Sequence, residues 1–167
     1  MDALVAKSFA WGESDPKRKM AMTILQGMLT ESTIRLATKQ EDMNDSSDLV
    51  ITKNGKDYGV GMRFRQWKYA NHRDLTIRAS LQSDHDTEFQ KIKRGKCRIY
   101  FYAWYNYDTN WLKYMVIDMD KFRETIIDEP DDKRFNTGGN QYTDTGFYCY
   151  NYKSLKKAGC IIKTNLT

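Results

Sequence analysis

The chain has 167 residues, of which 40 % are hydrophobic and 29 % are charged, values typical of one globular domain with its own core. The net charge of +5 favours polyanionic partners. No apolar run reaches the length of a membrane span, and the N-terminus lacks the apolar core of a signal peptide, so we expect a cytoplasmic protein without membrane contact. The three cysteines, Cys97, Cys149 and Cys160, form no CxxC pair, which argues against zinc and indicates reduced thiols.

The first predicted helix begins at Asp15-Pro16, where Asp15 suits the N-cap and Pro16 the first helical position. The residues at 34–39 are compatible with a short strand or with a helical continuation. An acidic stretch follows, and it lacks the glycine that a calcium-binding loop requires. Its acids are Glu41, Asp42, Asp45 and Asp48.

A β-hairpin is predicted around Asn54-Gly55, the dipeptide that most readily takes positive φ at both centres of a tight turn. Residues 48–53 and 57–65 should therefore form paired antiparallel strands. Alternation along the second strand places one set of side chains in the core: Tyr58, Val60, Met62 and Phe64. The other face is either solvated or lines a site, and it carries Gly59, Gly61, Arg63 and Arg65.

The rest of the chain predicts a strand at 74–80 and a short helix at 87–94, capped by Asp86 and ended by Gly95. An aromatic strand at 97–105 should be buried on both faces, and residues 128–146 form a long polar loop. Further strands are predicted at 111–119, 147–152 and 160–163, with a helix between the first two of these that is capped by Asp118 or Asp120.

From residue 16 to 105, the order helix, strand, strand, strand, helix, strand resembles the core of the PD-(D/E)xK nuclease superfamily, which has the restriction-endonuclease-like fold. The chain is also similar to uncharacterised bacteriophage proteins of that type, through Glu41-Asp42 before SSDLVI, then VGMRFR, DLTIRAS, TEFQKIKRG and YFYAW. The resemblance implies one α/β domain over residues 1–167, with a central mixed sheet flanked by helices and extra C-terminal strands after residue 105. It also implies a phage protein that acts in the host cytoplasm.

Nucleases of this superfamily hold one or two divalent metals, Mg²⁺ or Mn²⁺, between acids on adjacent strands. Asp48 matches the first acid, but the triplet on the next strand reads Gly61-Met62-Arg63. Glycine thus stands where the second acid belongs, and arginine replaces lysine. Arginine can clamp a phosphate but cannot act as a base.

Three substitutes for the missing acid and lysine are open. The first is the following helix, where Glu88 and Lys91 lie three positions apart on one flank and could reach the same site. The second is Asp42, which could supply another carboxylate. The third is Gln66-Trp67-Lys68, but its alternation directs it toward the core. The resemblance thus implies Asp42, Asp48 and Glu88 as metal ligands, with Lys91 assisting the water and Arg63 binding phosphate.

Further basic residues are candidates for phosphate contacts: Arg65, Arg78, Lys93, Arg94 and Lys96. Each candidate also has a structural interpretation. Asp48 could pair with Arg63 or Arg65 across the hairpin, and Glu88 with Lys91 on a helix surface. His72 and His85 lie in loops without a Ser or Cys partner in register, which argues against a catalytic triad.

Two functions remain open at this point. The first is a metal-dependent nuclease with a rearranged site, acting on nucleic acid. The second is a catalytically inactive nuclease-fold protein that binds and inhibits a host defence factor. A homodimer is a further expectation from the resemblance, because nucleases of this fold often dimerise.

Overall fold

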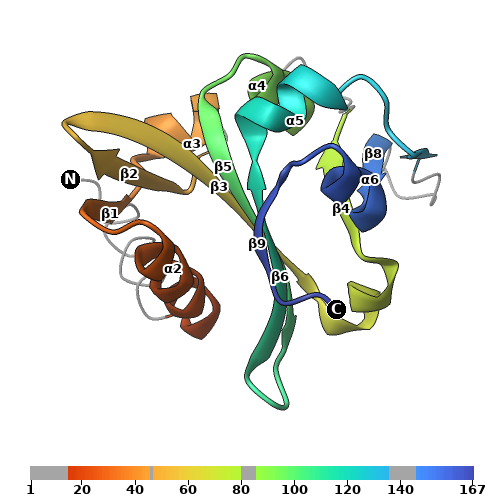
Figure 1. Cartoon of the computed structure of the whole chain (residues 1–167), viewed down its shortest axis with the longest axis horizontal. Coiled ribbons are helices and arrows are strands. Elements are labelled where there is room, and N and C mark those ends of the chain that lie inside the picture. The colour runs from red at the N-terminus through yellow and green to blue at the C-terminus, as the bar shows by residue number, and fades with distance from the viewer. Residues whose placement is uncertain (1–14, 46, 80–85, 136–145) are drawn as a thin grey trace.

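The computed structural model describes residues 15–45, 47–79, 86–135 and 146–167, and it confirms a mixed α/β fold. Within these residues six strands build a central sheet, and three further strands build a second sheet beside it (Figure 1). Across the central sheet the order is β1 (Ser32–Leu36), β2 (Leu49–Lys53), β3 (Lys56–Gln66), β5 (Cys97–Asn106), β6 (Trp111–Asp118) and β9 (Ile161–Thr164). The second sheet has the order β4 (Asp74–Arg78), β8 (Gly146–Asn151) and β7 (Asp132–Phe135).

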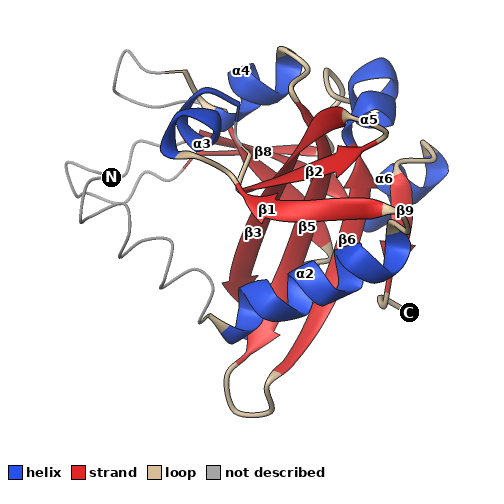
Figure 2. Cartoon of the chain, turned by 90° about the vertical axis from the view of Figure 1, so that its left-hand side faces the viewer, coloured by secondary structure: helices blue, strands red, loops and turns tan. Residues whose placement is uncertain are grey.

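The helices flank the central sheet on both faces, as expected (Figure 2). They are α2 (Pro16–Met28), α3 (Lys39–Asp45), α4 (Glu88–Lys93), α5 (Met119–Thr125) and α6 (Tyr152–Lys157), with the 3₁₀ helix η1 at Trp67–His72. Strands β3 and β5 run parallel, and the other neighbouring strands of this sheet are antiparallel. A parallel pair needs a long crossover, and here η1, β4 and α4 supply it. None of the described helices is long and apolar enough to cross a membrane.

The predicted hairpin is confirmed, because Asn54 and Gly55 take φ values of 53° and 71° between the paired residues Lys53 and Lys56. Helix α2 begins at the predicted cap, where the Asp15 carboxylate accepts from the Lys17 backbone N–H at 3.0 Å. The predicted cap of α4 is wrong. Thr87 caps this helix in a reciprocal arrangement with Gln90, and Asp86 instead pairs with Arg94.

The strand expected at 74–80 forms as β4, but it pairs with β8 in the second sheet rather than joining the central one. Strand β1 forms in the region that the sequence left open between strand and helix, and it pairs with β2 at the edge of the central sheet. The observed order up to residue 106 is α2, β1, α3, β2, β3, η1, β4, α4 and β5, so it contains more elements than the six of the expected core. The expected loop over 128–146 contains strand β7, which pairs with β8, and residues 136–145 lie outside the described part of the chain.

Strand β5 is buried on both faces, as predicted, and divides the core in two. Phe101, Ala103 and Tyr105 pack toward α2 through Ala21 and Leu25. The β5 residues of opposite parity, Tyr100, Tyr102 and Trp104, belong to the second cluster. There they pack with Phe122 of α5, Leu75 of β4 and Tyr150 of β8. Burial of these large side chains is the main stabilising contribution to the fold.

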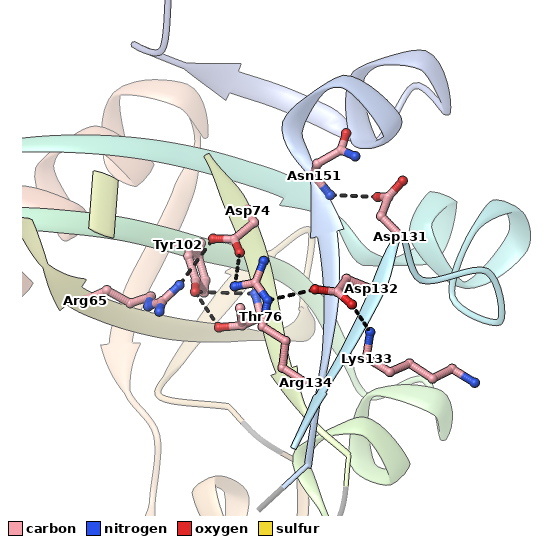
Figure 3. A network of polar contacts seen from close by, with 9 residues as sticks. All are labelled: Arg65, Asp74, Thr76, Tyr102, Asp131, Asp132, Lys133, Arg134 and Asn151. Carbon is pink, nitrogen blue, oxygen red and sulfur yellow. Dashed lines mark hydrogen bonds and ion pairs between the residues drawn. The ribbon is translucent and has the colours of Figure 1, made fainter. Parts of the chain in front are cut away.

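The second sheet is joined to the central one by a polar contact as well as by apolar packing (Figure 3). The Asp74 carboxylate, whose residue is 3 % exposed, accepts from Arg65 of β3 at 3.2 Å and from Arg134 of β7 at 3.0 Å. Beside it, the Thr76 and Tyr102 hydroxyls lie 2.7 Å apart. A buried acid held by two guanidinium groups thus links strands from both sheets.

Candidate functional site

An open cavity of about 300 Å³ lies where β3 and β5 meet the head of β2 and the helices α3 and α4. We call it the Asp48 pocket. It is lined by Asp42, Asp48, Met62, Arg63, Arg78, Glu88, Lys91 and Tyr100. Six of these are residues that the sequence nominated, and they come from five separate stretches of the chain.

Asp48 is fixed by the backbone on both sides. Its own N–H donates to the Val60 carbonyl at 2.8 Å, and its carbonyl accepts from Ala37 at 2.9 Å. Its side-chain Oδ2 accepts from the Met62 N–H at 2.6 Å. No ion pair joins it to Arg63 or Arg65 among the described residues, so the structural interpretation as a cross-hairpin pair is wrong.

Burial raises the pKa of the Asp48 carboxyl from 3.8 to about 6. The Met62 N–H and Arg18 oppose this shift, whereas the negative charges of Asp42 and Glu88 add to it. Burial therefore makes the ionised form of Asp48 less favourable than that of an exposed aspartate, and the two neighbouring acids add to this effect.

The raised pKa predicts a pH-dependent stability. Between about pH 4 and pH 6 the folded state keeps a proton on Asp48 that the unfolded state has lost, so the contribution of Asp48 to the free energy of unfolding falls as pH rises through this window. We expect Asp48→Asn to be equally stable near pH 4 and about 2 kcal/mol more stable than the unmodified protein at pH 7. Urea unfolding at both pH values measures this; a difference that does not change with pH would contradict it.

Glu88 lies at the start of α4, and both of its carboxylate oxygens are engaged. Oε2 accepts from Arg63 Nη1 at 2.9 Å and from the Arg78 backbone N–H at 3.0 Å. Oε1 accepts from the Tyr100 hydroxyl. Burial, followed by the charge of Glu88, raises the pKa of Tyr100 well above its ordinary value, so the phenol stays protonated and donates. Glu88 is thus held by the pocket rather than by the neighbouring Lys91.

Tyr100 is a pocket residue that the sequence did not reveal. It stands in an aromatic strand, where most side chains are core, and it is itself 2 % exposed. Register pairs it with Gly61 of the neighbouring strand β3. That pairing is the only signal that could have singled out Tyr100, and it requires knowing which strands are neighbours.

The structure does not bring the other nominated residues into the pocket. Arg65 pairs with Asp74 and lies 4.9 Å from the Tyr69 ring. Lys93 pairs with Asp128 at 2.7 Å, and Arg94 with Asp86, both at the exposed surface. Lys96 lines a separate cavity.

The two remaining motifs also lie elsewhere. The triplet Gln66-Trp67-Lys68 falls across the end of β3 and the start of η1. The prediction that it points toward the core is wrong for Gln66 and Lys68, which are exposed, whereas Trp67 packs against the core. His72 ends η1, and His85 lies outside the described residues.

The donor set of the pocket decides how a metal could be held. Among the described residues, no group of three or more His, Cys, Asp or Glu side chains is arranged to hold a metal ion. Asp42 and Asp48 do offer two carboxylates, which leave Asp48 with an unfavourable charge that a cation would relieve. Mg²⁺ commonly takes one or two protein carboxylates and completes its shell with water and substrate phosphate. The residues therefore fit a divalent cation shared with a phosphate, not one held by protein alone.

The described residues thus form a mixed α/β fold with a polar pocket at the head of β2. No protein-family model matches the chain, and no curated protein matches it either. Among solved structures, the chain is similar to D212, a nuclease from a fusselovirus, at 13 % sequence identity and a TM-score of 0.35. The match covers 84 % of this chain and 82 % of that chain.

Proposed function

We propose that the protein acts on nucleic acid as a divalent-metal-dependent nuclease with a rearranged PD-(D/E)xK site. The observation that supports this most is the shared lining of the Asp48 pocket. Three carboxylates (Asp42, Asp48 and Glu88) stand there beside three cations (Arg63, Arg78 and Lys91). Metal-catalysed phosphodiester hydrolysis needs carboxylates that hold the metal and cationic side chains that bind the phosphate.

In this proposal, Asp42 and Asp48 hold Mg²⁺ or Mn²⁺, which when bound activates a water and stabilises charge on the phosphate. Arg63 is already placed against a carboxylate at 2.9 Å. Because a guanidinium binds carboxylate and phosphate oxygens in the same geometry, Arg63 can exchange Glu88 for the substrate phosphate. That exchange would remove one of the three hydrogen bonds to Glu88. Glu88 would then be the third oxygen donor, with Lys91 assisting the water.

The proposal is tested by cation binding and cleavage together. We expect Mg²⁺ or Mn²⁺ to raise the melting temperature, because a ligand that binds only the folded state stabilises it. Plasmid DNA, single-stranded DNA and RNA are then incubated with each cation or with EDTA. Asp48→Asn should remove the thermal shift, and Asp108→Asn, an exposed acid in the β5–β6 turn, should retain it. Absence of both the shift and the cleavage would refute the nuclease proposal.

The pH dependence of cation binding gives a second check. Asp48 must be ionised to bind a cation, and its pKa is about 6. We therefore expect the thermal shift by Mg²⁺ to grow as the pH rises through 6. A shift that is equally large at pH 5 and pH 8 would contradict the assignment of Asp48 as a ligand.

A second candidate is a catalytically inactive nuclease-fold protein that binds and inhibits a host defence factor. Gly61 favours it, since it stands where the superfamily has an acid, and so does the ion pair between Arg63 and Glu88 that engages the pocket carboxylate. The two candidates are separated by a salt titration. The nuclease candidate predicts nucleic-acid binding that weakens steeply as salt is added, because its contacts are to phosphates. Nucleic acid that stays uncleaved, together with binding of a protein partner that does not depend on salt, would favour the inhibitor.

A further inference from the structure

A second cavity of about 540 Å³ lies next to the Asp48 pocket. It is lined in part by Glu41, Tyr58, Gly59 and Lys96, and we call it the Tyr58 cavity. Neighbouring residues of the same two segments line the two cavities. Glu41 and Ser47 line the Tyr58 cavity, whereas Asp42 and Asp48 line the Asp48 pocket. The two cavities therefore lie on either side of one short part of the chain.

The two acids of the Tyr58 cavity, Glu41 and Asp57, share one arginine. Arg35 donates to both carboxylate oxygens of Glu41 at 2.9 Å and lies 3.5 Å from Asp57. The hydrogen bond from Arg35 and that from the Thr38 backbone lower the pKa of Glu41 to about 2. Two exposed cations, Lys56 and Lys96, complete the lining. An anionic ligand therefore meets lysines here and not unpaired carboxylates.

Tyr58 and Arg98 form one wall of the cavity. The Arg98 guanidinium lies over the half-buried ring of Tyr58, at 4.8 Å from its centroid, and its Nε donates to Asp120 at 2.7 Å. Stacked guanidinium and aromatic groups are the surfaces on which proteins bind unpaired bases.

Glycine at position 59 is required by close packing under this cavity. A Cβ there would lie 2.1 Å from the Ser47 Oγ and 3.0 Å from the Lys96 carbonyl. The residues that separate the two hollows thus pack directly against the strand that carries Tyr58. The cavity volume is within the range of sites that hold small organic ligands. A nucleotide base is therefore small enough to enter the cavity and can stack on its lining.

We propose that the Tyr58 cavity binds the nucleotide adjacent to the phosphate held in the Asp48 pocket, with its base stacked against the Tyr58–Arg98 pair and its backbone near Lys56 and Lys96. This inference rests on the proposed function and specifies its substrate class. A base can reach this surface only when it is unpaired, so the preferred substrate is single-stranded nucleic acid or an unpaired end.

The test is a binding measurement in EDTA, so that no cleavage occurs. The probe is a fluorescein-labelled oligothymidylate of about 12 nucleotides, a length within single-strand site sizes, compared with a duplex of equal length. We expect the single strand to bind more tightly than the duplex. Tyr58→Ala should weaken single-strand binding about tenfold, because stacking on an aromatic residue is lost. Tyr58→Phe keeps the ring and should bind like the unmodified protein.

A matched control is Trp111→Ala, which removes an aromatic residue that is 57 % exposed at the far end of the β5–β6 hairpin. It should leave binding unchanged, and melting curves report whether each variant is folded. Equal binding by folded Tyr58→Ala and the unmodified protein, or a preference for duplex, would overturn the inference. Cleavage of nucleic acid with no effect of Tyr58→Ala would overturn only this inference; Tyr58-dependent binding without any metal-dependent cleavage would overturn only the nuclease proposal.

Discussion

Asp48→Asn is expected to reduce phosphodiester cleavage about a thousandfold, equivalent to ~4 kcal/mol of transition-state stabilisation, because it removes the charge that the proposed cation requires. The substitution is close to isosteric, and the amide oxygen can still accept from the Met62 N–H, which Asp48 Oδ2 accepts at 2.6 Å. The variant should therefore remain folded. Initial rates of cleavage of a labelled single strand, at saturating Mg²⁺ and pH 8, measure the effect.

The matched control for this experiment is Asp108→Asn. It also replaces an acid by its amide, but Asp108 is exposed and lies outside the Asp48 pocket. Its rate should equal that of the unmodified protein. A folded Asp48→Asn variant that cleaves within a few fold of the unmodified rate would rule out Asp48 as an essential ligand. The nuclease would then have to use other acids.

Asp74→Ala is expected to destabilise the protein by about 3 kcal/mol, since breaking a buried ion pair leaves a charged partner uncompensated. The Asp74 side chain is 4 % exposed, and its loss removes the ion-pair partner of Arg65, whereas Arg134 keeps Asp132 at 2.9 Å. These arginines are 21 % and 47 % exposed, so water offsets part of the loss and keeps the effect at the lower end of the range for buried pairs. The free energy of unfolding in urea is the quantity to compare.

Asp132→Ala provides the contrast, because this acid also pairs with Arg134, at 2.9 Å, but its side chain is 56 % exposed. Such a pair contributes roughly 0.5 kcal/mol. Similar losses for the two variants would show that the buried position of Asp74 does not matter, and that the second sheet is held by apolar packing alone.

Local patterns in the sequence were sufficient for the elements whose conformation depends on neighbours in the chain. Asn54-Gly55 specified the hairpin, and Asp15-Pro16 specified the start of α2. The destination of β4 could not be predicted in the same way. Its alternation is equally compatible with either sheet, and pairing with β8 joins residues more than sixty positions apart.

The candidate site shows the same division. Alternation on β3 correctly put Arg63 and Arg65 on one face, but it could not show that one would reach Glu88 and the other Asp74. Those partners depend on where α4 and β4 lie in space. Asp48 and Glu88 line one pocket because β3 pairs antiparallel with β2 and parallel with β5, so the crossover between β3 and β5 returns α4 to the head of β2.

Tyr100 ties the chemistry of the pocket to the integrity of the whole molecule. It belongs to the strand shared by both halves of the core, and its hydroxyl holds Glu88 from below. An acid on a surface helix is thereby anchored to the core. Substitutions of buried β5 residues should consequently disturb the orientation of Glu88 before they unfold the protein, so that a weaker response to the proposed cation would be an early sign of a weakened core.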